Sequence, residues 1–373
     1  MEDRKPVGIF PFRAELLPIV KRFDQLQSKF ILKRVFSYPG SGLVGKDAAY
    51  ACNQPDVGIE VEQFGEDNLE GIETVILFNP LEKSKKTDED LLQLSKTSLQ
   101  HGRSVLLCCN FTDSVVESAS ELKESFPNFA FSFDNNFPKE RSFGKAMYYK
   151  RLDVPVILFG SLVKNPDTLE AICYLNEYFS KIDMKCLVIS NTSAGELFGF
   201  KNLSPILDSK DMADSTKIEE MNRYANDLVS ELNPSFVLVE APDAVMRFND
   251  ITPNGFGVLS YMVSQAFQPD HLICSIPFEL AVPEMVKALS KDFEIRLGTP
   301  ISAALATNIV VDSAENLQTH VMSSLFVPMS YSMPKLSQVQ RADDIPIFSV
   351  INKNDPRLFM HITDLLAIHL DRR

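Results

Sequence analysis

The fold of the second half of the chain is decided by the stretch VPVILFGSLVKNPDT, residues 154–168. Its first six residues are almost all apolar, which predicts a strand buried on both faces and therefore a mostly parallel sheet. Asn165 follows as a predicted helix cap, with Pro166 and Asp167 in the first turn of the helix. A buried strand, a short loop and a capped helix form the repeating unit of a doubly wound α/β domain.

The same alternation continues toward the C-terminus. Apolar residues at 218, 221, 225, 228 and 232 have the spacing of a helix face, and a further helix is predicted over residues 255–267. Strands are predicted over residues 186–190, 235–240 and 271–276. After about residue 329 we predict a tail that lies across other parts of the fold and ends in a helix over residues 356–370.

The first half of the chain shows a similar pattern. Short apolar runs predict strands over residues 7–11, 30–38, 74–78 and 104–109, and residues 88–101 have the periodicity of a helix lying on a sheet. We therefore predict an α/β protein with two doubly wound, mostly parallel sheets. The predicted parts are a Rossmann-like or flavodoxin-like domain over residues 1–150, a degenerate P-loop-type domain over 151–330, and a C-terminal extension over 331–373.

Composition argues against several classes of protein. The 373 residues include 37 basic and 50 acidic side chains, and the basic ones are scattered, so we expect no binding to nucleic acid. No apolar run approaches the roughly 18 residues of a membrane span, and no secretory signal is visible, so we expect a cytoplasmic protein. The six cysteines lack a metal-binding spacing and are predicted to be reduced core residues, and we expect neither a metal site nor a cofactor.

The loop GSGLVGKD, residues 40–47, matches the phosphate-loop pattern at every fixed position except the last. In that pattern backbone amides surround phosphate, a lysine contacts the terminal phosphate and a hydroxyl binds magnesium. Asp47 replaces the hydroxyl residue, and its carboxylate would repel phosphate. A Gly-rich turn is the simpler interpretation, and a site for a smaller anion or a peptide carboxylate lies between the two. The candidate ligand residues here are Gly40, Gly42, Gly45, Lys46 and Asp47.

Residues 160–168 show the opposite combination, because they occupy the place of a phosphate loop but lack its residues. Asn165 and Pro166 stand where glycine and lysine are expected. Proline has no backbone amide to face a phosphate, and no ammonium group is supplied. We predict that tight triphosphate binding is lost at this loop, and Ser161 is retained as a candidate ligand residue.

Other candidates lie near the predicted carboxyl ends of strands, where ligands bind in such sheets. Glu240 and Asp243 could act in acid–base chemistry or bind magnesium, or they could simply cap nearby backbone. Asn191 and Glu196 belong to a polar segment that could line the same crevice or form a structural turn. Asn254 lies in a polar turn that would help to close the crevice.

The segment Leu238-Val239-Glu240-Ala241-Pro242 and the predicted strand order resemble the dethiobiotin-synthetase-like branch of P-loop proteins, over about residues 154–276. Nearly the whole chain is similar to a family of clostridial peptide maturation system proteins, found in gene clusters that make modified bacteriocin-like peptides alongside radical S-adenosylmethionine enzymes. Separated motifs carry this likeness, at residues 42–48, 195–200 and 254–266. The resemblance implies a precursor peptide or a radical S-adenosylmethionine maturation enzyme as partner, and it carries over no catalytic residue.

We therefore expect a non-catalytic or weakly catalytic accessory protein, because the sequence shows no nucleophile–base pair, metal cluster or intact phosphate loop in its usual place. Its function would be to bind the precursor peptide or its modification enzyme at the carboxyl ends of the two sheets. Two alternatives stay open: a nucleotide-dependent, ligase-like or phosphoryl-transfer enzyme that uses Lys46 and Glu240, and a small-molecule-binding module. An oligomer is possible.

Overall fold

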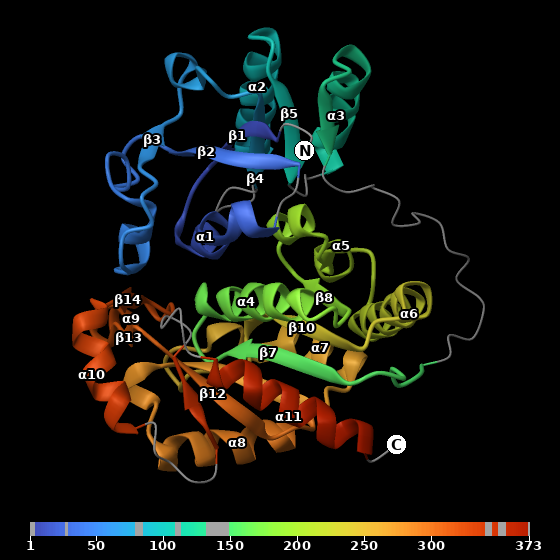
Figure 1. Cartoon of the computed structure of the whole chain (residues 1–373), viewed down its shortest axis with the longest axis vertical. Coiled ribbons are helices and arrows are strands. Elements are labelled where there is room, and N and C mark those ends of the chain that lie inside the picture. Colours follow the sequence, from blue (N-terminus) through green and yellow to red (C-terminus); the bar gives the residue numbers. More distant parts are fainter. Residues whose placement is uncertain are drawn as a thin grey trace. The chain divides into compact units, whose positions relative to one another are not determined.

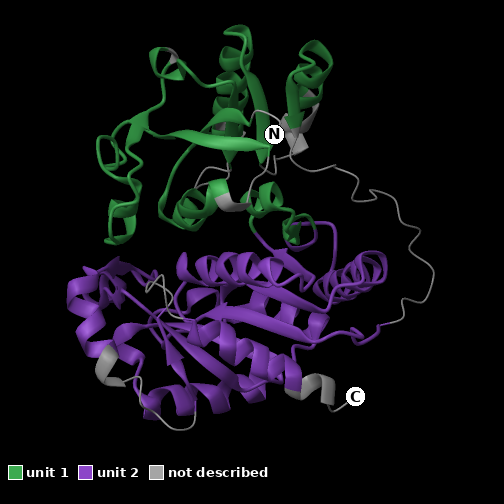
Figure 2. Ribbon diagram, in the orientation of Figure 1, with its two compact units in different colours: residues 1–141, 192–205 green, residues 142–191, 206–373 purple. Residues whose placement is uncertain are grey.

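The computed structural model describes residues 4–26, 29–78, 85–108, 113–131, 149–339, 345–349 and 356–371. The chain divides into two compact units (Figure 2): unit 1 is Met1–Arg141 with Thr192–Pro205, and unit 2 is Ser142–Asn191 with Ile206–Arg373. The sequence placed Thr192–Pro205 in the second domain, whereas the structure groups it with unit 1. The Ser193 hydroxyl donates to the carbonyl of Cys108 at 2.5 Å, and the ring of Phe198 packs edge-on against Phe23.

Unit 1 is built on a six-stranded parallel sheet of order β3-β2-β1-β4-β5-β6. Helix α1 lies on one side of this sheet, and α2 and α3 lie on the other (Figure 1). Apolar residues of the strands and of α2 form its core, with Phe10, Phe36, Leu77 and Leu91 almost fully buried. The strands are β1 (Lys5–Phe10), β2 (Phe30–Ser37), β3 (Val61–Gln63), β4 (Thr74–Phe78), β5 (Ser104–Cys108) and β6 (Phe129–Phe131). The helices are η1 (Ala14–Leu16), α1 (Leu17–Leu26), η2 (Ala48–Cys52), η3 (Glu66–Leu69), α2 (Lys85–Gln100), α3 (Asp113–Ser125) and η4 (Ser193–Phe198).

The second sheet has seven strands in the order β15-β12-β11-β7-β10-β8-β9, and the neighbouring strands from β15 to β8 are parallel. All six residues of β7 are buried, as expected for a central parallel strand. The strands are β7 (Val156–Ser161), β8 (Cys186–Ser190), β9 (Lys201–Asn202), β10 (Phe236–Ala244), β11 (His271–Pro277), β12 (Ile301–Thr307) and β15 (Ile347–Phe348). The helices are α4 (Asp167–Lys181), α5 (Ser204–Leu207), α6 (Asp214–Leu232), η5 (Asn254–Gly257), α7 (Val258–Phe267), η6 (Phe278–Leu280), α8 (Pro283–Leu297), α9 (Ser313–Thr319), α10 (Met329–Val339) and α11 (Arg357–Asp371). A small antiparallel pair, β13 (Ile309–Val311) and β14 (Ser324–Phe326), completes unit 2.

The predicted fold class is confirmed, since both large sheets are mostly parallel and helices connect their strands. The C-terminal tail belongs to unit 2, where β15 pairs with β12 at the sheet edge. Phe359 of α11 stacks on Tyr178 of α4, with ring centroids 3.5 Å apart. Of the cysteines, Cys109 lies outside the described residues; Cys52, Cys108, Cys173 and Cys274 are buried, and Cys186 is partly buried. None of the helices in the described ranges is long and apolar enough to cross a bilayer.

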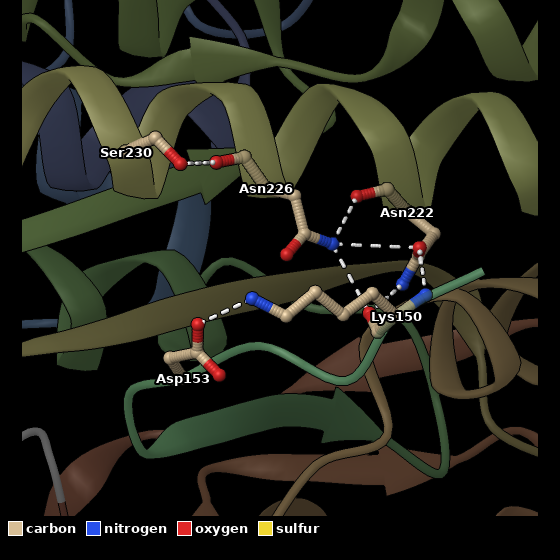
Figure 3. A network of polar contacts seen from close by, with 5 residues as sticks. All are labelled: Lys150, Asp153, Asn222, Asn226 and Ser230. Carbon is tan, nitrogen blue, oxygen red and sulfur yellow. Dashed lines mark hydrogen bonds and ion pairs between the residues drawn. The ribbon is translucent and has the colours of Figure 1, made fainter. Parts of the chain in front are cut away.

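The start of unit 2 is attached to α6 by a network of polar contacts (Figure 3). Asn222 is almost fully buried, accepts a hydrogen bond from the Lys150 amide at 3.0 Å and donates to the Lys150 carbonyl at 2.8 Å. The same side-chain amide donates to the carbonyl of Ala266 at the end of α7. Asn226, one turn further along α6, adds a longer bond to the Lys150 carbonyl. Asn222 therefore joins three segments that are far apart in the sequence.

Two local predictions need correction. The strand predicted over residues 235–240 continues to Ala244, so Asp243 lies inside it rather than after it. The helix predicted from residue 255 begins only at Val258, because Asn254–Gly257 form a turn with positive φ angles. Both corrections concern the part of unit 2 where the candidate ligand residues lie.

Candidate functional site

The candidate site of unit 2 lies at the carboxyl ends of two neighbouring strands, β7 and β10, whose following connections run in opposite directions across the sheet. From β7 the chain continues through α4 to β8 on one side, and from β10 it continues through α7 to β11 on the other. The carboxyl ends of two such strands form the usual ligand crevice of an open α/β sheet. The structure brings five of the predicted residues to this place, which we call the carboxyl edge: Ser161, Asn191, Glu240, Asp243 and Asn254.

An irregularity in β10 shapes the carboxyl edge. Glu240 is paired with Phe159, and the next paired residue, Ala244, is opposite Ser161. Four residue steps on β10 thus correspond to two on β7, so the chain bulges between Glu240 and Ala244. Bulges redirect side chains at the rims of sheets and next to active sites. This bulge places Asp243 on a strand that the sequence predicted to have ended.

Glu240 is held by the neighbouring strand β8. The Ser190 hydroxyl donates to its carboxyl oxygen Oε2 at 2.5 Å, and the backbone amide of Asn191 donates to it as well. Burial raises the pKa of Glu240, although these two hydrogen bonds and the charge of Lys164 act in the opposite direction. Ser190 and Lys164 are contributors that the sequence did not identify. A raised carboxyl pKa at the end of a strand is one recognised mark of a functional site.

Asp243 faces a different set of neighbours. Its Oδ1 accepts a hydrogen bond from the following amide, that of Ala244, at 3.0 Å, and a Cβ on Gly255 would lie 3.3 Å from its Oδ2. Its carbonyl accepts a hydrogen bond from the Ser260 hydroxyl of α7 at 2.8 Å. Glu240 thus contacts β8, whereas Asp243 contacts the turn before α7. No described contact joins the two carboxyl groups, so their convergence on one ligand stays a prediction.

In residues 160–168, which occupy the place of a phosphate loop, the side chain of Asn165 forms hydrogen bonds with the surrounding residues. Asn165 accepts hydrogen bonds from the Asp167 amide at 3.0 Å and from the Ser275 hydroxyl at 3.1 Å. Its side-chain nitrogen donates to the Val163 carbonyl at 2.6 Å. The helix α4 begins one residue later than predicted, with Pro166 at the N-cap and no side-chain cap there, but Asn165 still binds the first helical amide, that of Asp167.

Gly160 has a packing role that needs no phosphate. A Cβ at this position would lie 2.4 Å from the Cγ1 atom of Val245, closer than any real contact. The glycine thus allows Val245, which follows β10, to pack against the end of β7. The amide of Val245 donates to the Ser161 carbonyl at 2.9 Å and holds this contact.

The Gly40–Asp47 loop belongs to unit 1 and follows β2. Gly40, Gly42 and Gly45 all have positive φ angles, between 75° and 79°, as tight turns require. The Gly45 amide donates to the Val61 carbonyl at 2.8 Å, and the Lys46 amide donates to the Leu43 carbonyl at 3.0 Å. These amides, which a phosphate loop would direct at its ligand, are used within the protein.

The two charged residues of this loop also have partners. Lys46 Nζ lies 3.7 Å from the centre of the Tyr50 ring. The Asp47 carboxylate accepts hydrogen bonds from the backbone amides of Ala49, Val57, Gly58 and Ile59, at 2.8–3.1 Å. A five-residue 3-10 helix follows, in place of the long α-helix that supports a phosphate loop. The loop is organised around Asp47 as a structural element.

Glu196, the last predicted residue, lies in η4 of the segment that groups with unit 1. Only the fold of that segment could reveal this, because the sequence around Glu196 continues directly from β8. Across the described part of the chain, no three His, Cys, Asp or Glu side chains gather in a group that could hold a metal ion.

Comparison with known proteins supports the fold alone. No protein-family model matches the chain. No curated protein matches it either. Among solved structures, a DUF1611 family protein from Anabaena variabilis is similar in fold, with a TM-score of 0.61 at 10% identity, over 98% of this chain and 99% of that one. Chloroplast FtsY from Physcomitrella patens matches with a TM-score of 0.28 at 12% identity, over 60% of this chain and 67% of that one.

Proposed function

We propose that this chain is a cytoplasmic accessory protein of a system that matures ribosomally made peptides, and that unit 2 binds the precursor peptide or its modification enzyme at the carboxyl edge. The observation that carries the proposal is the composition of this edge. Glu240 and Asp243 both lie at the end of β10, and Asp243 adjoins the turn that carries the exposed Phe256. The side chain of Asn165 accepts a hydrogen bond from the first amide of α4, which would otherwise favour a phosphate. An exposed aromatic side chain suits recognition of a polypeptide, because aromatic residues are enriched at protein interfaces. A neighbouring carboxylate can select a partner of opposite charge.

The resemblance to peptide maturation proteins supports the same proposal. One of its motifs, residues 254–266, forms the turn and helix beside Asp243. The motif that includes Gly45 and Lys46 forms a loop stabilised by Asp47, which favours a structural role over nucleotide chemistry. We therefore infer binding as the function and assign no catalytic residue.

The proposal is tested by recovering partners from the native host. The tagged full-length chain is used as bait in a strain that expresses the gene cluster, and bound proteins and peptides are identified by mass spectrometry. We expect the wild-type chain to recover a precursor peptide or a radical S-adenosylmethionine enzyme. The double variant Glu240→Gln, Asp243→Asn should recover much less, whereas Glu284→Gln, an exposed change on α8, should behave as wild type. Recovery of neither partner by the wild-type chain would refute the accessory function.

A second candidate function, binding of a small anionic ligand, is favoured by one feature of unit 1. In unit 1 the connections after the neighbouring strands β1 and β4 run in opposite directions, to β2 and to β5. Ligands bind at the carboxyl ends of such a strand pair, and Arg13 follows β1. Among the described residues, the Arg13 Nε atom is buried without a hydrogen-bond partner, and it forms an ion pair with the Glu15 carboxylate at 3.7 Å. Burial lowers the pKa of Arg13, and Glu15 and Tyr38 act against this effect.

Native mass spectrometry of the purified protein tests this second candidate. A bound small anion should be present in the wild-type chain and absent from Arg13→Ala. Arg103→Ala is the matched control, because Arg103 Nε is also buried without a partner but lies before β5, at the opposite end of the strands. A measured mass of the wild-type protein equal to that of the polypeptide alone would count against this function.

A further inference from the structure

The turn before α7 has an unusual backbone conformation. Its four residues, Asn254, Gly255, Phe256 and Gly257, have φ angles of 48°, 65°, 54° and 69°. Elsewhere in the described ranges, non-glycine residues with positive φ lie at the carboxyl ends of helices, where this conformation is common: Asn53, Asp183, Asn233, Gln268 and His320. Asn254 and Phe256 instead precede a helix.

Phe256 gains nothing within the fold that would favour this conformation. Asparagine tolerates positive φ because its short polar side chain can bond locally, but a bulky side chain in this region is an outlier. The side chain of Phe256 is also 60% exposed, so burial of its ring does not offset the strain. Neither the backbone preference nor the packing of unit 2 explains a phenylalanine at this position.

The surroundings impose the strained conformation on the turn. The Asn254 side chain donates to the Leu162 carbonyl at 3.1 Å, which ties the turn to the loop after β7. A Cβ on Gly257 would lie 2.4 Å from the Val245 carbonyl oxygen, so the turn approaches the end of β10 too closely for any other residue. The turn is therefore held from two sides, and the backbone of Phe256 is fixed between them. Strained residues kept in place by their surroundings concentrate at ligand-binding and active sites.

The surface next to Phe256 has two further features, exposed apolar side chains on α7 and the carboxylate of Asp243. Val258 and Tyr261, three residues apart on α7, are each 48% exposed and extend the apolar surface. The Asp243 carboxylate lies beside Gly255, and its only hydrogen bond to a described residue is with the Ala244 amide; no described Lys, Arg or His forms an ion pair with it. An aromatic surface thus adjoins a carboxylate that lacks a cationic partner in the described structure.

We propose that Phe256, Val258 and Tyr261 form a docking contact for a peptide segment that carries an apolar side chain next to a lysine or arginine, with Asp243 receiving the positive charge. This proposal rests on the proposed function and names its contact residues. A second copy of the chain is a poorer occupant, because the protein has a net charge of −13 and a symmetric contact would bring Asp243 near its own equivalent.

Panning a phage library of random dodecapeptides on the immobilised full-length chain tests the proposal. We expect the wild-type chain to enrich peptides with an apolar residue beside Lys or Arg. Phe256→Asn and Phe256→Gly should bind these peptides about tenfold more weakly or worse. Asp243→Asn should lose the preference for the basic residue. Ile295→Asn, at an 84% exposed position on α8, is the control and should bind as wild type does.

Thermal unfolding supplies the second measurement. Because Asn and Gly accept positive φ more readily than Phe, both Phe256 variants should melt about 2 °C or more above the wild-type chain while binding less well. Gain of stability together with loss of binding supports the docking role. A lower melting temperature would show that Phe256 serves the fold, and would overturn the proposal.

The remaining outcomes are also decisive. Unchanged peptide binding by Phe256→Asn, or no enrichment by the wild-type chain, would overturn the proposal. The proposal would also be overturned if light scattering showed that the wild-type chain is a dimer and that Phe256→Asn is a monomer. If the native-host experiment recovers a precursor peptide equally with wild type and Phe256→Asn, the proposed function stands and this contact is wrong.

Discussion

At the scale of the residue, Asp47 shows how one side chain can organise a loop that looks like a ligand site. Four backbone amides donate to its carboxylate. Burial alone would raise the pKa of Asp47, but these hydrogen bonds outweigh burial and hold the pKa below its usual range. The sequence identified Asp47 as the departure from the phosphate-loop pattern. It could not identify the donors, because three of them follow ten to twelve residues later.

Replacing Asp47 with Asn should lower the free energy of unfolding by about 1–2 kcal/mol at pH 7, because an amide cannot accept all four hydrogen bonds. A carboxyl group whose pKa is lowered in the folded state stabilises the fold above its unfolded pKa, about 3.9, and loses this contribution as the pH falls through the folded pKa. The difference between wild type and variant should therefore shrink at acid pH. Urea denaturation across the pH range measures it.

Asp56→Asn is the control for this experiment. Asp56 lies exposed in the same loop, so its replacement should change the free energy of unfolding by less than about 0.5 kcal/mol at any pH. If Asp47→Asn and Asp56→Asn gave the same pH profile, the hydrogen bonds of Asp47 would contribute nothing to stability.

At the scale of the element, helix and strand positions followed well from periodicity, and their ends did not. The helix predicted over residues 88–101 forms as Lys85–Gln100, and the strand predicted over 74–78 forms as Thr74–Phe78. In contrast, β10 continues through its bulge and α7 starts three residues late. Both ends depend on contacts with β7 and its loop, which are remote in the sequence.

The attachment of α6 to the start of unit 2 allows a prediction at this scale. Asn222→Ala should lower the free energy of unfolding by about 2–3 kcal/mol, because it leaves the Lys150 amide and the Lys150 and Ala266 carbonyls with fewer partners in a buried place. Asn226→Ala, on the same helix but partly exposed, should cost about 1 kcal/mol or less. Guanidinium denaturation followed by circular dichroism compares the two. Equal losses would show that the buried network of Asn222 is not the main attachment.

At the scale of the whole molecule, both loops that resemble a phosphate loop use several of their amides within the protein. Millimolar Mg-ATP should therefore leave the melting temperature of the full-length chain unchanged, whereas a ligand at 100 times its dissociation constant would add about 2.7 kcal/mol of stability. Differential scanning fluorimetry measures this effect, with Lys46→Ala as the matched variant. A stabilisation by ATP that disappears in Lys46→Ala would instead establish the nucleotide-dependent alternative.

The sequence by itself determined the α/β class, the two parallel sheets and the loss of the glycine and lysine of a phosphate loop in the second half. These properties depend on residue type and on spacing along a short stretch of chain. Only the tertiary structure decided that Thr192–Pro205 groups with unit 1, that β10 bulges to redirect Asp243, and that Phe256 is held with a positive φ angle. Each of these depends on contacts between segments far apart in the sequence, which local residue chemistry does not specify.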